Sequence, residues 1–201
     1  MTQININIAY EDRLHEAVVI KMMQSSGREY YIVQKFSRAG SGYLRSSVKK
    51  FNMLAQHLPV FLLTDLDDQA CPPSLIQNWL PYKKHSNFVF RVAVREVEAW
   101  VMADRQAFSK FISVSSAKIP RNLDSVPDPK QLLLNLAHKS TLRRIRDDLV
   151  TIRREQILIG RNYNDRLSKF VENDWNPDRA SSHSDSLQRA MESLAKFAPL
   201  I

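Results

Sequence analysis

The residues best suited to chemistry are acidic side chains that follow an unbroken apolar run. Residues 59–68 read PVFLLTDLDD, and the run ends in Asp65, Asp67 and Asp68. A strand that is apolar on every residue must be covered on both faces, and the carboxyl ends of such parallel strands border the crevice where open α/β sheets place their sites. Carboxylate oxygens are the ligands that hard divalent cations prefer. The segment therefore predicts a site for Mg²⁺ or Mn²⁺ on these three acids.

A second acid occupies the corresponding place after the first strand that we expect. Glu11 directly follows residues 4–10, so it should converge with Asp65 and Asp67 if the two strands are neighbours. Successive strand residues point to opposite faces, so Asp65 and Asp67 are expected to share a direction. The structural alternative is that Asp65 and Asp68 only cap turns, as aspartates often do.

Further charged residues follow the expected strand at 88–94. Arg95 could bind a phosphate with two hydrogen bonds, and one of the two glutamates, Glu98 in preference to Glu96, could complete the metal shell and belong to the catalytic site. The alternative is that both glutamates are first-turn acids that complement a helix dipole. His15 is the histidine nearest to the expected site, but the five histidines show no ligand-like spacing, so we favour a structural role for it.

Hydrophobic periodicity predicts the elements that position these residues. The expected strands are 4–10, 30–36, 60–64 and 88–94, and the expected helices are 14–22, 44–58, 74–80 and 96–112. This alternation predicts an α/β fold with a parallel sheet and right-handed crossovers. The first strand alternates Ile with Asn, which places it nearer the sheet edge or under a polar covering layer.

The second half of the chain has a different pattern. Prolines interrupt residues 114–129, which predicts a loop or linker, and helices are expected at 131–136, at 142–152 and on both sides of Asn176-Pro177. We therefore expect an α/β core at residues 1–113, with a linker and helical C-terminal region at 114–201 packed on it. Arginines on the expected helix at 142–152 and just beyond form either a phosphate-tracking stripe or a salt-bridged surface.

Composition narrows the classes of protein. With 201 residues and 44% hydrophobic content, the chain can bury a core. Its net charge of +8 is typical of an enzyme that acts on a polyanion, and the alternative is a basic surface that only confers solubility. The single cysteine, Cys71, excludes an internal disulfide, and no Cys/His cluster indicates zinc. No stretch approaches the roughly 18 apolar residues of a membrane span, so we expect a cytoplasmic protein. Nucleotide-binding glycine loops and a serine-hydrolase elbow are lacking.

The order of a Glu after the first strand and an Asp-x-Asp after the third resembles the Toprim family, over about residues 4–100. This resemblance implies a Toprim-like Rossmannoid sheet flanked by helices. It also implies that Glu11 is the acid/base or metal-bridging carboxylate and that Asp65 and Asp67 are metal ligands. The family glutamate is usually followed by glycine, whereas this chain has Asp12 there.

Longer pieces resemble a bacterial Toprim-related family of unknown function whose members are often encoded beside ABC-type ATPases in phage-defence or mobile-element loci. They are EDRLHEAV, TDLDDQACPPSLIQNWL, REVEAWVMAD and the tail GRNYNDRLSKFV. The resemblance implies a metal-dependent nuclease or phosphotransferase acting on DNA or RNA, with an ABC-type ATPase as an expected partner. A second copy of the chain is a further expected partner. The alternative function is a non-catalytic or partner-dependent binding module. A phospho-acceptor receiver domain fits less well because its acidic pair should follow the first strand.

Overall fold

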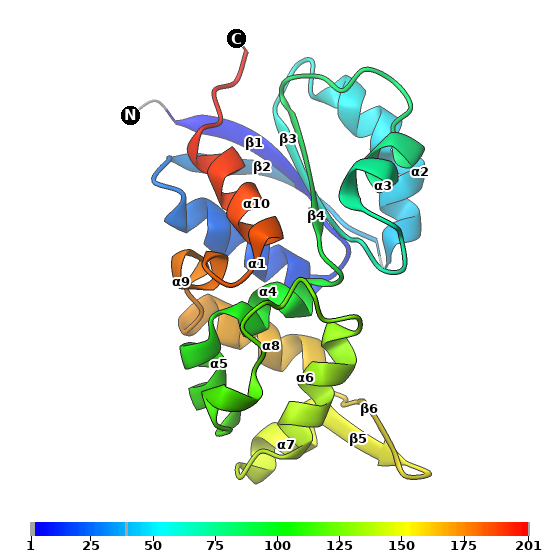
Figure 1. Cartoon of the computed structure of the whole chain (residues 1–201). Helices are drawn as coiled ribbons and strands as arrows, with labels where there is room; N and C mark the ends of the chain where they lie inside the picture. Colours follow the sequence, from blue (N-terminus) through cyan, green and yellow to red (C-terminus); the bar gives the residue numbers. More distant parts are fainter. Residues whose placement is uncertain (1–2, 39, 201) are drawn as a thin grey trace.

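A computed structural model describes residues 3–38 and 40–200 of the chain. The main sheet has four parallel strands in the order β2-β1-β3-β4. Its strands are β1 (Ile4–Ala9), β2 (Tyr30–Phe36), β3 (Val60–Asp65) and β4 (Phe88–Ala93). The predicted α/β class with a parallel sheet flanked by helices is therefore confirmed (Figure 1).

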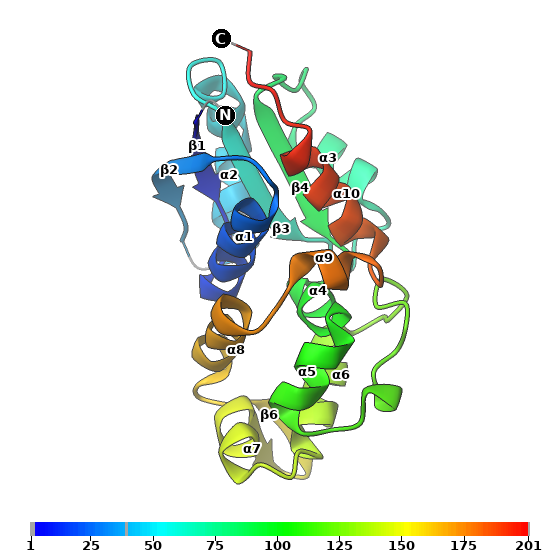
Figure 2. The same ribbon diagram turned by 90° about the vertical axis from the view of Figure 1, so that its left-hand side faces the viewer.

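Two layers of helices cover the sheet. Alternate strand side chains pack on one face against α1 (Arg13–Ser25) and helices of the C-terminal half, and on the other face against α2 (Ser41–Leu54) and α3 (Pro72–Trp79). Figure 2 shows α1 and α10 (Asp185–Ala195) on the side of the sheet opposite to α2 and α3. Every residue of β3 is buried, as expected for an inner strand covered on both faces.

The first strand corrects one expectation. β1 pairs with β2 on one side and β3 on the other, so it is not near the sheet edge. Its alternation has another cause: Ile4, Ile6 and Ile8 belong to the core on the α1 side, whereas Asn5 is exposed at the start of the strand. Asn7 is buried and its side-chain amide has no hydrogen-bond partner among the described residues. The edge strands are β2 and β4, and β2 is the largely exposed one.

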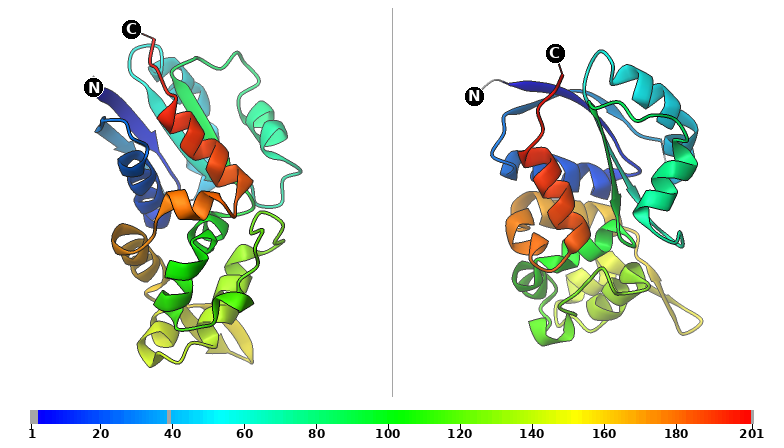
Figure 3. Two further views of the ribbon diagram at one scale, coloured as in Figure 1. Left: turned by 60° about the vertical axis from the view of Figure 1, so that its left-hand side comes forward. Right: turned by 45° about the horizontal axis from the view of Figure 1, so that its top comes forward.

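The C-terminal half is mainly helical and lies beyond the carboxyl edge of the sheet, except that α10 returns alongside β4 (Figure 3). Its elements are α4 (Val97–Ala103), α5 (Arg105–Ile112), the 3-10 helix η1 (Ser116–Lys118), α6 (Pro129–His138), α7 (Arg143–Leu149), β5 (Val150–Arg153), β6 (Gln156–Ile159), α8 (Tyr163–Asn173), α9 (Pro177–Ser181) and α10. The division at residues 113/114 stays a prediction. Within the described ranges, no helix has the length and apolar character that crossing a membrane requires.

Three expectations about helices are wrong in detail. The helix expected at 96–112 is two helices, because the chain breaks at Asp104, a buried side chain that accepts hydrogen bonds from Arg179 and from the backbone of Asn176. The helix expected at 142–152 ends at Leu149, and Ile152 lies in the β5–β6 hairpin. The tail forms three helices, α8, α9 and α10, rather than two.

Candidate metal centre

Glu11 and Asp65 meet at the carboxyl edge of the sheet. Glu11 lies in the loop between β1 and α1, and Asp65 is the last residue of β3. One oxygen of Glu11, Oε1, accepts hydrogen bonds from the Thr64 hydroxyl at 2.6 Å and from the Asp65 backbone N–H at 3.0 Å. The predicted neighbourhood of these two strands therefore brings the two acids together, and one oxygen of Glu11 is fixed by β3.

Two contacts position the Asp65 carboxylate, and both are made through the same carboxylate oxygen. Asp65 Oδ1 accepts from the backbone N–H of Val97 at 2.8 Å and lies 3.1 Å from Nε2 of His15. Nδ1 of His15 lies 2.8 Å from Oδ1 of Asp12, which also caps α1 through the N–H groups of Leu14 and His15. Asp65 is thus positioned by the start of α4 and by a buried histidine of α1.

Electrostatics favour a charged His15. Burial alone would lower the pKa of His15, but the carboxylates of Asp65 and Asp12 raise it well above its ordinary value. Burial would likewise raise the pKa of Asp12, yet the hydrogen bonds and charge of His15 lower that pKa to about 2. The three side chains form an Asp12–His15–Asp65 chain in which the imidazolium donates to both carboxylates.

Glu11, His15 and Asp65 each offer one ligand atom within 4.8 Å of the others, a spacing that can hold a metal ion. Both nitrogens of His15 already have carboxylate partners, so its geometry fits a positioning role better than a ligand role. The second oxygens of Glu11 and Asp65 have no hydrogen-bond partner among the described residues. Neither oxygen is fully buried. These two oxygens are therefore open to a ligand.

Asp67 lies beside this pair but not as strand alternation predicts. β3 ends at Asp65, and Asp67 adopts a left-handed conformation with φ of 49° in an exposed turn. Its N–H donates to the backbone oxygen of Arg95, while its carboxylate has no partner in the described part of the chain. Partial burial raises the pKa of Asp67 to about 6, and the charges of Asp65, Glu11 and Glu96 add to this shift. Asp67 therefore lies near the acidic cluster but outside the group of Glu11, His15 and Asp65, so its role as a ligand stays a prediction.

Asp68 and Arg95 lie at the edge of the same region. Asp68 is exposed in the turn and is outside the three-residue cluster, so its role as a ligand stays a prediction. One nitrogen of the Arg95 guanidinium donates to the backbone oxygens of Asp67 at 3.0 Å and Gln69 at 3.1 Å. Arg95 thus fixes the Asp-x-Asp turn, and its remaining N–H groups are available to a phosphate.

Glu96 and Glu98 surround a lysine from a distant part of the sequence. Glu96 accepts from the backbone N–H of Lys130 at 2.9 Å and from its ammonium group at 2.8 Å. The same ammonium lies 3.7 Å from Glu98, whose Oε1 also accepts from the Tyr163 hydroxyl at 3.1 Å. The carboxylates of Glu96 and Glu98 therefore bind side chains of α6 and α8 rather than only complementing the dipole of α4.

Burial disfavours the charged form of Glu98. Burial raises the pKa of Glu98 to about 7, against the opposing charge of Lys130 and with added repulsion from Asp65 and Glu96. Its Oε2 is buried without a partner among the described residues. Burial and the nearby Glu98 raise the pKa of the Tyr163 hydroxyl well above its ordinary value, so Tyr163 remains a hydrogen-bond donor.

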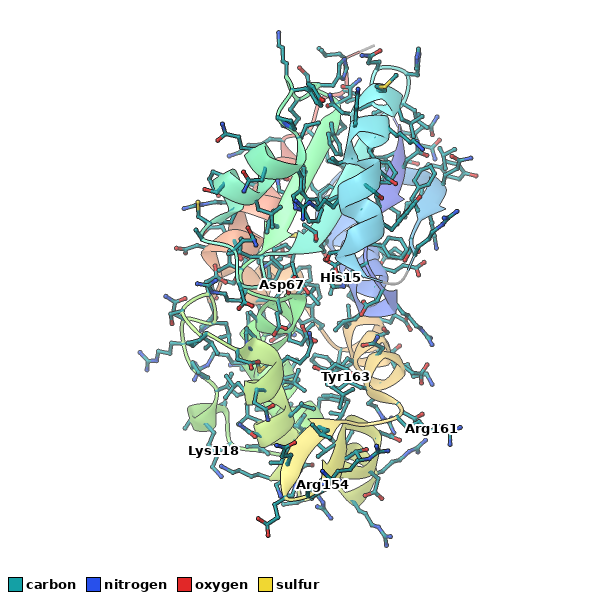
Figure 4. The ribbon with its side chains drawn as sticks, turned by 90° about the vertical axis from the view of Figure 1, so that its right-hand side faces the viewer. His15, Asp67, Lys118, Arg154, Arg161 and Tyr163 are labelled. Carbon is teal, nitrogen blue, oxygen red and sulfur yellow. The ribbon has the colours of Figure 1, made fainter. Side chains whose placement is uncertain are left out.

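Asp67 lies between two hollows at this edge of the sheet. One, of about 570 Å³, is lined by residues 67–68, 95–96, 127–128, 130–131, 134 and 157–159. The other, of about 470 Å³, is lined by Asp65, Asp67 and residues from the start of α2 and from α3, including Arg45 and Trp79. Figure 4 shows Asp67 and His15 where the sheet meets the helical half, with Tyr163 on the helical side. The carboxylates thus border space that an extended substrate could fill.

Sequence reasoning missed two members of this site and gave little weight to a third. Lys130 follows the proline-rich stretch that we expected to be a linker, and no local spacing links it to Glu96. Tyr163 lies in the GRNYNDRL tail segment, which carried the family resemblance without a role for that residue. His15 follows Asp12, the residue that caps α1, by three positions, and that spacing was the available signal.

Comparison with known proteins adds a distant likeness. No family model matches the sequence, and no curated protein sequence matches it. Among solved structures, the chain is similar to the C-terminal region of the Burkholderia pseudomallei OLD protein, with 13% identity, coverage of 94% of this chain and 96% of that chain, and a TM-score of 0.41. At this TM-score the functional assignment rests on the chain's own residues.

Proposed function

We propose that this protein is a Toprim-like, divalent-metal-dependent nuclease or phosphotransferase that acts on nucleic acid. One observation carries the proposal: Glu11 and Asp65 each have one oxygen fixed by hydrogen bonds and the other free, and the unpartnered carboxylate of Asp67 lies beside them. Fixed carboxylates with open oxygens are what a hard cation needs on the side facing its substrate.

The donor set fits Mg²⁺ or Mn²⁺. Carboxylate oxygens suit these ions, and a bound cation would relieve the repulsion that adds to the effect of burial on the pKa of Asp67. We propose that Glu11, Asp65 and Asp67 hold the ion, with Asp68 at the exposed rim. When bound, it would supply positive charge that stabilises a phosphoryl group in the transition state.

The remaining residues would act on the substrate or on the ligands. His15 would hold Asp65 in position, and the Val97 N–H would assist it. Arg95 and Lys130 line the larger hollow together with Asp67, so their N–H groups could bind phosphate oxygens. Lys130 keeps its charge because Glu98 and Glu96 raise its pKa against the effect of burial. Glu98 supports that lysine from a buried position and would not contact the substrate.

The test is cleavage of DNA and, separately, of tRNA by the purified protein with Mn²⁺ or Mg²⁺. We expect Asp67→Ala to abolish cleavage and to weaken Mn²⁺ binding measured by calorimetry, because it removes a ligand without removing a buried contact. Asp178→Ala is the matched control, since it deletes an exposed carboxylate of α9 that lines neither hollow at this edge of the sheet. Cleavage that persists undiminished in Asp67→Ala would refute the proposed site.

The second candidate is a binding module that works only with an ABC-type ATPase. The hydrogen bonds from Arg95 to the Asp-x-Asp turn favour this candidate, because they occupy one guanidinium nitrogen that a phosphate could otherwise contact. Failure of the isolated protein to take up Mn²⁺, together with co-purification of an ATPase, would favour this candidate over the first. We expect Mn²⁺ uptake by the isolated protein.

A further inference from the structure

The β5–β6 hairpin forms a two-stranded ribbon at the end of the molecule farthest from the main sheet (Figure 1). Its strands are antiparallel, with Val150 opposite Ile159 and Arg153 opposite Gln156. Its base is fixed, because the N–H of Gly160 donates to the backbone oxygen of Leu149 and any Cβ at Gly160 would lie 2.4 Å from the backbone oxygen of Asp148. The ribbon is therefore a defined arm.

The tip of this ribbon has an unusual composition. Arg154 and Glu155 adopt left-handed conformations, with φ of 49° and 65°. Two-residue hairpin turns with two positive φ angles are normally made by Asn-Gly or Asp-Gly, because longer side chains are strained there. The turn therefore places an arginine side chain at the tip of the ribbon, at a position where Asn or Asp is the usual residue.

Positive charge concentrates around the ribbon. Residues 139–161 contain seven Lys and Arg against three Asp and Glu, a net charge of +4 out of +8 for the whole chain. The exposed arginines of this region that form no ion pair with a described residue are Arg144, Arg153, Arg154 and Arg161. Only Arg143 is paired within its own helix, with Asp147. The alternative of a salt-bridged helix surface is therefore wrong for Arg153 and Arg154, which lie on the ribbon and not on a helix.

The base of the ribbon also lines the larger hollow, which Asp67 shares. Three consecutive residues of β6, Ile157, Leu158 and Ile159, line the larger hollow with Asp67 and Lys130. Side chains of consecutive strand residues alternate between faces, so the open edge of β6 forms this wall. A chain that lies across the carboxylates would thus continue along β6 toward Arg153 and Arg154, and Figure 4 shows Arg154 on the same side of the molecule as Asp67.

We propose that the β5–β6 ribbon is a substrate-binding arm whose arginines hold the phosphodiester backbone of a nucleic acid that reaches the metal centre. The inference rests on the proposed function for its substrate class. Arginine fits phosphate because its planar fork donates two parallel hydrogen bonds, and each neutralised phosphate releases counterions. The same physics makes the contact measurable through its salt dependence.

The experiment measures binding of labelled duplex DNA, single-stranded DNA and RNA of equal length to the full chain in EDTA, at several salt concentrations. We expect Arg153→Ala with Arg154→Ala to weaken binding about tenfold and to reduce the salt slope by about two, since each lost phosphate contact removes about 0.9 from it on duplex DNA. The matched control is Lys50→Ala with Lys83→Ala, which removes the same charge from exposed positions elsewhere.

A second variant separates the guanidinium from net charge and from folding. Arg154→Asn with Glu155→Gly leaves the net charge unchanged and installs the preferred turn pair, so we expect equal or greater thermal stability together with a salt slope reduced by about one. A purely structural turn would give the stability change without the change in slope. Unchanged affinity and salt slope in both ribbon variants would overturn the proposal. It would also be overturned if the variants changed only the oligomeric state of the protein, as measured by sedimentation.

The two proposals fail in different ways. If the protein binds nucleic acid through the ribbon in EDTA but never cleaves it with Mn²⁺, the arm stands and the catalytic assignment is wrong. If it cleaves with Mn²⁺ and the ribbon variants cleave limiting substrate at the wild-type rate, the catalytic assignment stands and the arm is wrong.

Discussion

Glu11 Oε1 accepts a hydrogen bond from the backbone N–H of Asp65 at 3.0 Å, so the loop after β1 is tied to the last residue of β3. The Thr64 hydroxyl donates to the same oxygen at 2.6 Å. This contact explains how two acids 54 positions apart share one site. Neither donor requires a charged acceptor, so the structural role of Glu11 can be separated from a role as a metal ligand.

Glu11→Gln should separate these roles. The amide oxygen can still accept from Thr64 and Asp65, so we expect the free energy of unfolding to stay within about 1 kcal/mol of wild type. Metal affinity and cleavage should fall by more than about 100-fold, because loss of a ligand exceeds the 10–100-fold cost of altering the residues that support one. Urea denaturation and Mn²⁺ calorimetry measure the two effects.

Two companion variants complete this test. Glu11→Ala also leaves the Asp65 N–H without its partner, and we expect it to unfold about 1–2 kcal/mol more easily than Glu11→Gln. Glu16→Gln, which alters a glutamate of α1 paired with Lys35, should leave metal binding unchanged. Full metal affinity in Glu11→Gln would show that this carboxylate is not a ligand.

Much of the sheet could be predicted because its signals are local. The strands expected at 60–64 and 88–94 are confirmed as β3 and β4. The proximity of the acids after β1 and β3 followed from the rule that neighbouring parallel strands end at the same edge of a sheet. His15 could have been weighted more heavily, because it lies three positions after Asp12, at the start of the helix that follows Glu11. The roles of Glu11, Asp65 and Asp67 in binding metal stay predictions.

The rest depended on contacts that no local pattern records. The break at Asp104 is set by Arg179, 75 positions away, and the Lys130 contact with Glu96 spans 34 positions. The β5–β6 hairpin was missed because Arg154-Glu155 carries none of the usual turn signals and because the preceding apolar spacing continues that of a helix. Strand alternation failed at Asp67 because the chain leaves the sheet two residues earlier.

Asp104→Ala should destabilise the junction of α4, α5 and α9. The buried Asp104 carboxylate accepts two hydrogen bonds from the Arg179 guanidinium, at 3.1 and 2.6 Å, and one from the Asn176 N–H at 2.9 Å. Removing it leaves these donors without their acceptor, so we expect a loss of about 3 kcal/mol in urea denaturation. Asp165→Ala, which breaks exposed pairs with Arg13 and Lys169, should produce no measurable change. Equal effects of the two variants would contradict this explanation.

Glu98→Gln should change how stability depends on pH. Burial raises the pKa of Glu98 to about 7 from its ordinary value of 4.5, so between these values the folded protein binds more protons than the unfolded chain. Stability from this group is therefore fully present below pH 4.5 and is lost as the pH rises through 7. Glutamine remains neutral and can still accept from Tyr163. We expect the variant to be more stable than wild type by about 3 kcal/mol at pH 8 and nearly equal at pH 4.5.

Urea denaturation of wild type and Glu98→Gln at half-unit steps from pH 4.5 to 8 measures this difference, provided that both proteins give the same slope against denaturant. Glu172→Gln serves as the control, because it neutralises an exposed glutamate of α8 and should give a difference that does not vary across the same range. A Glu98→Gln variant that is less stable at pH 8 would mean that the attraction between Lys130 and a charged Glu98 outweighs burial. In that case the lysine, rather than the apolar surroundings, would set the charge of this carboxylate.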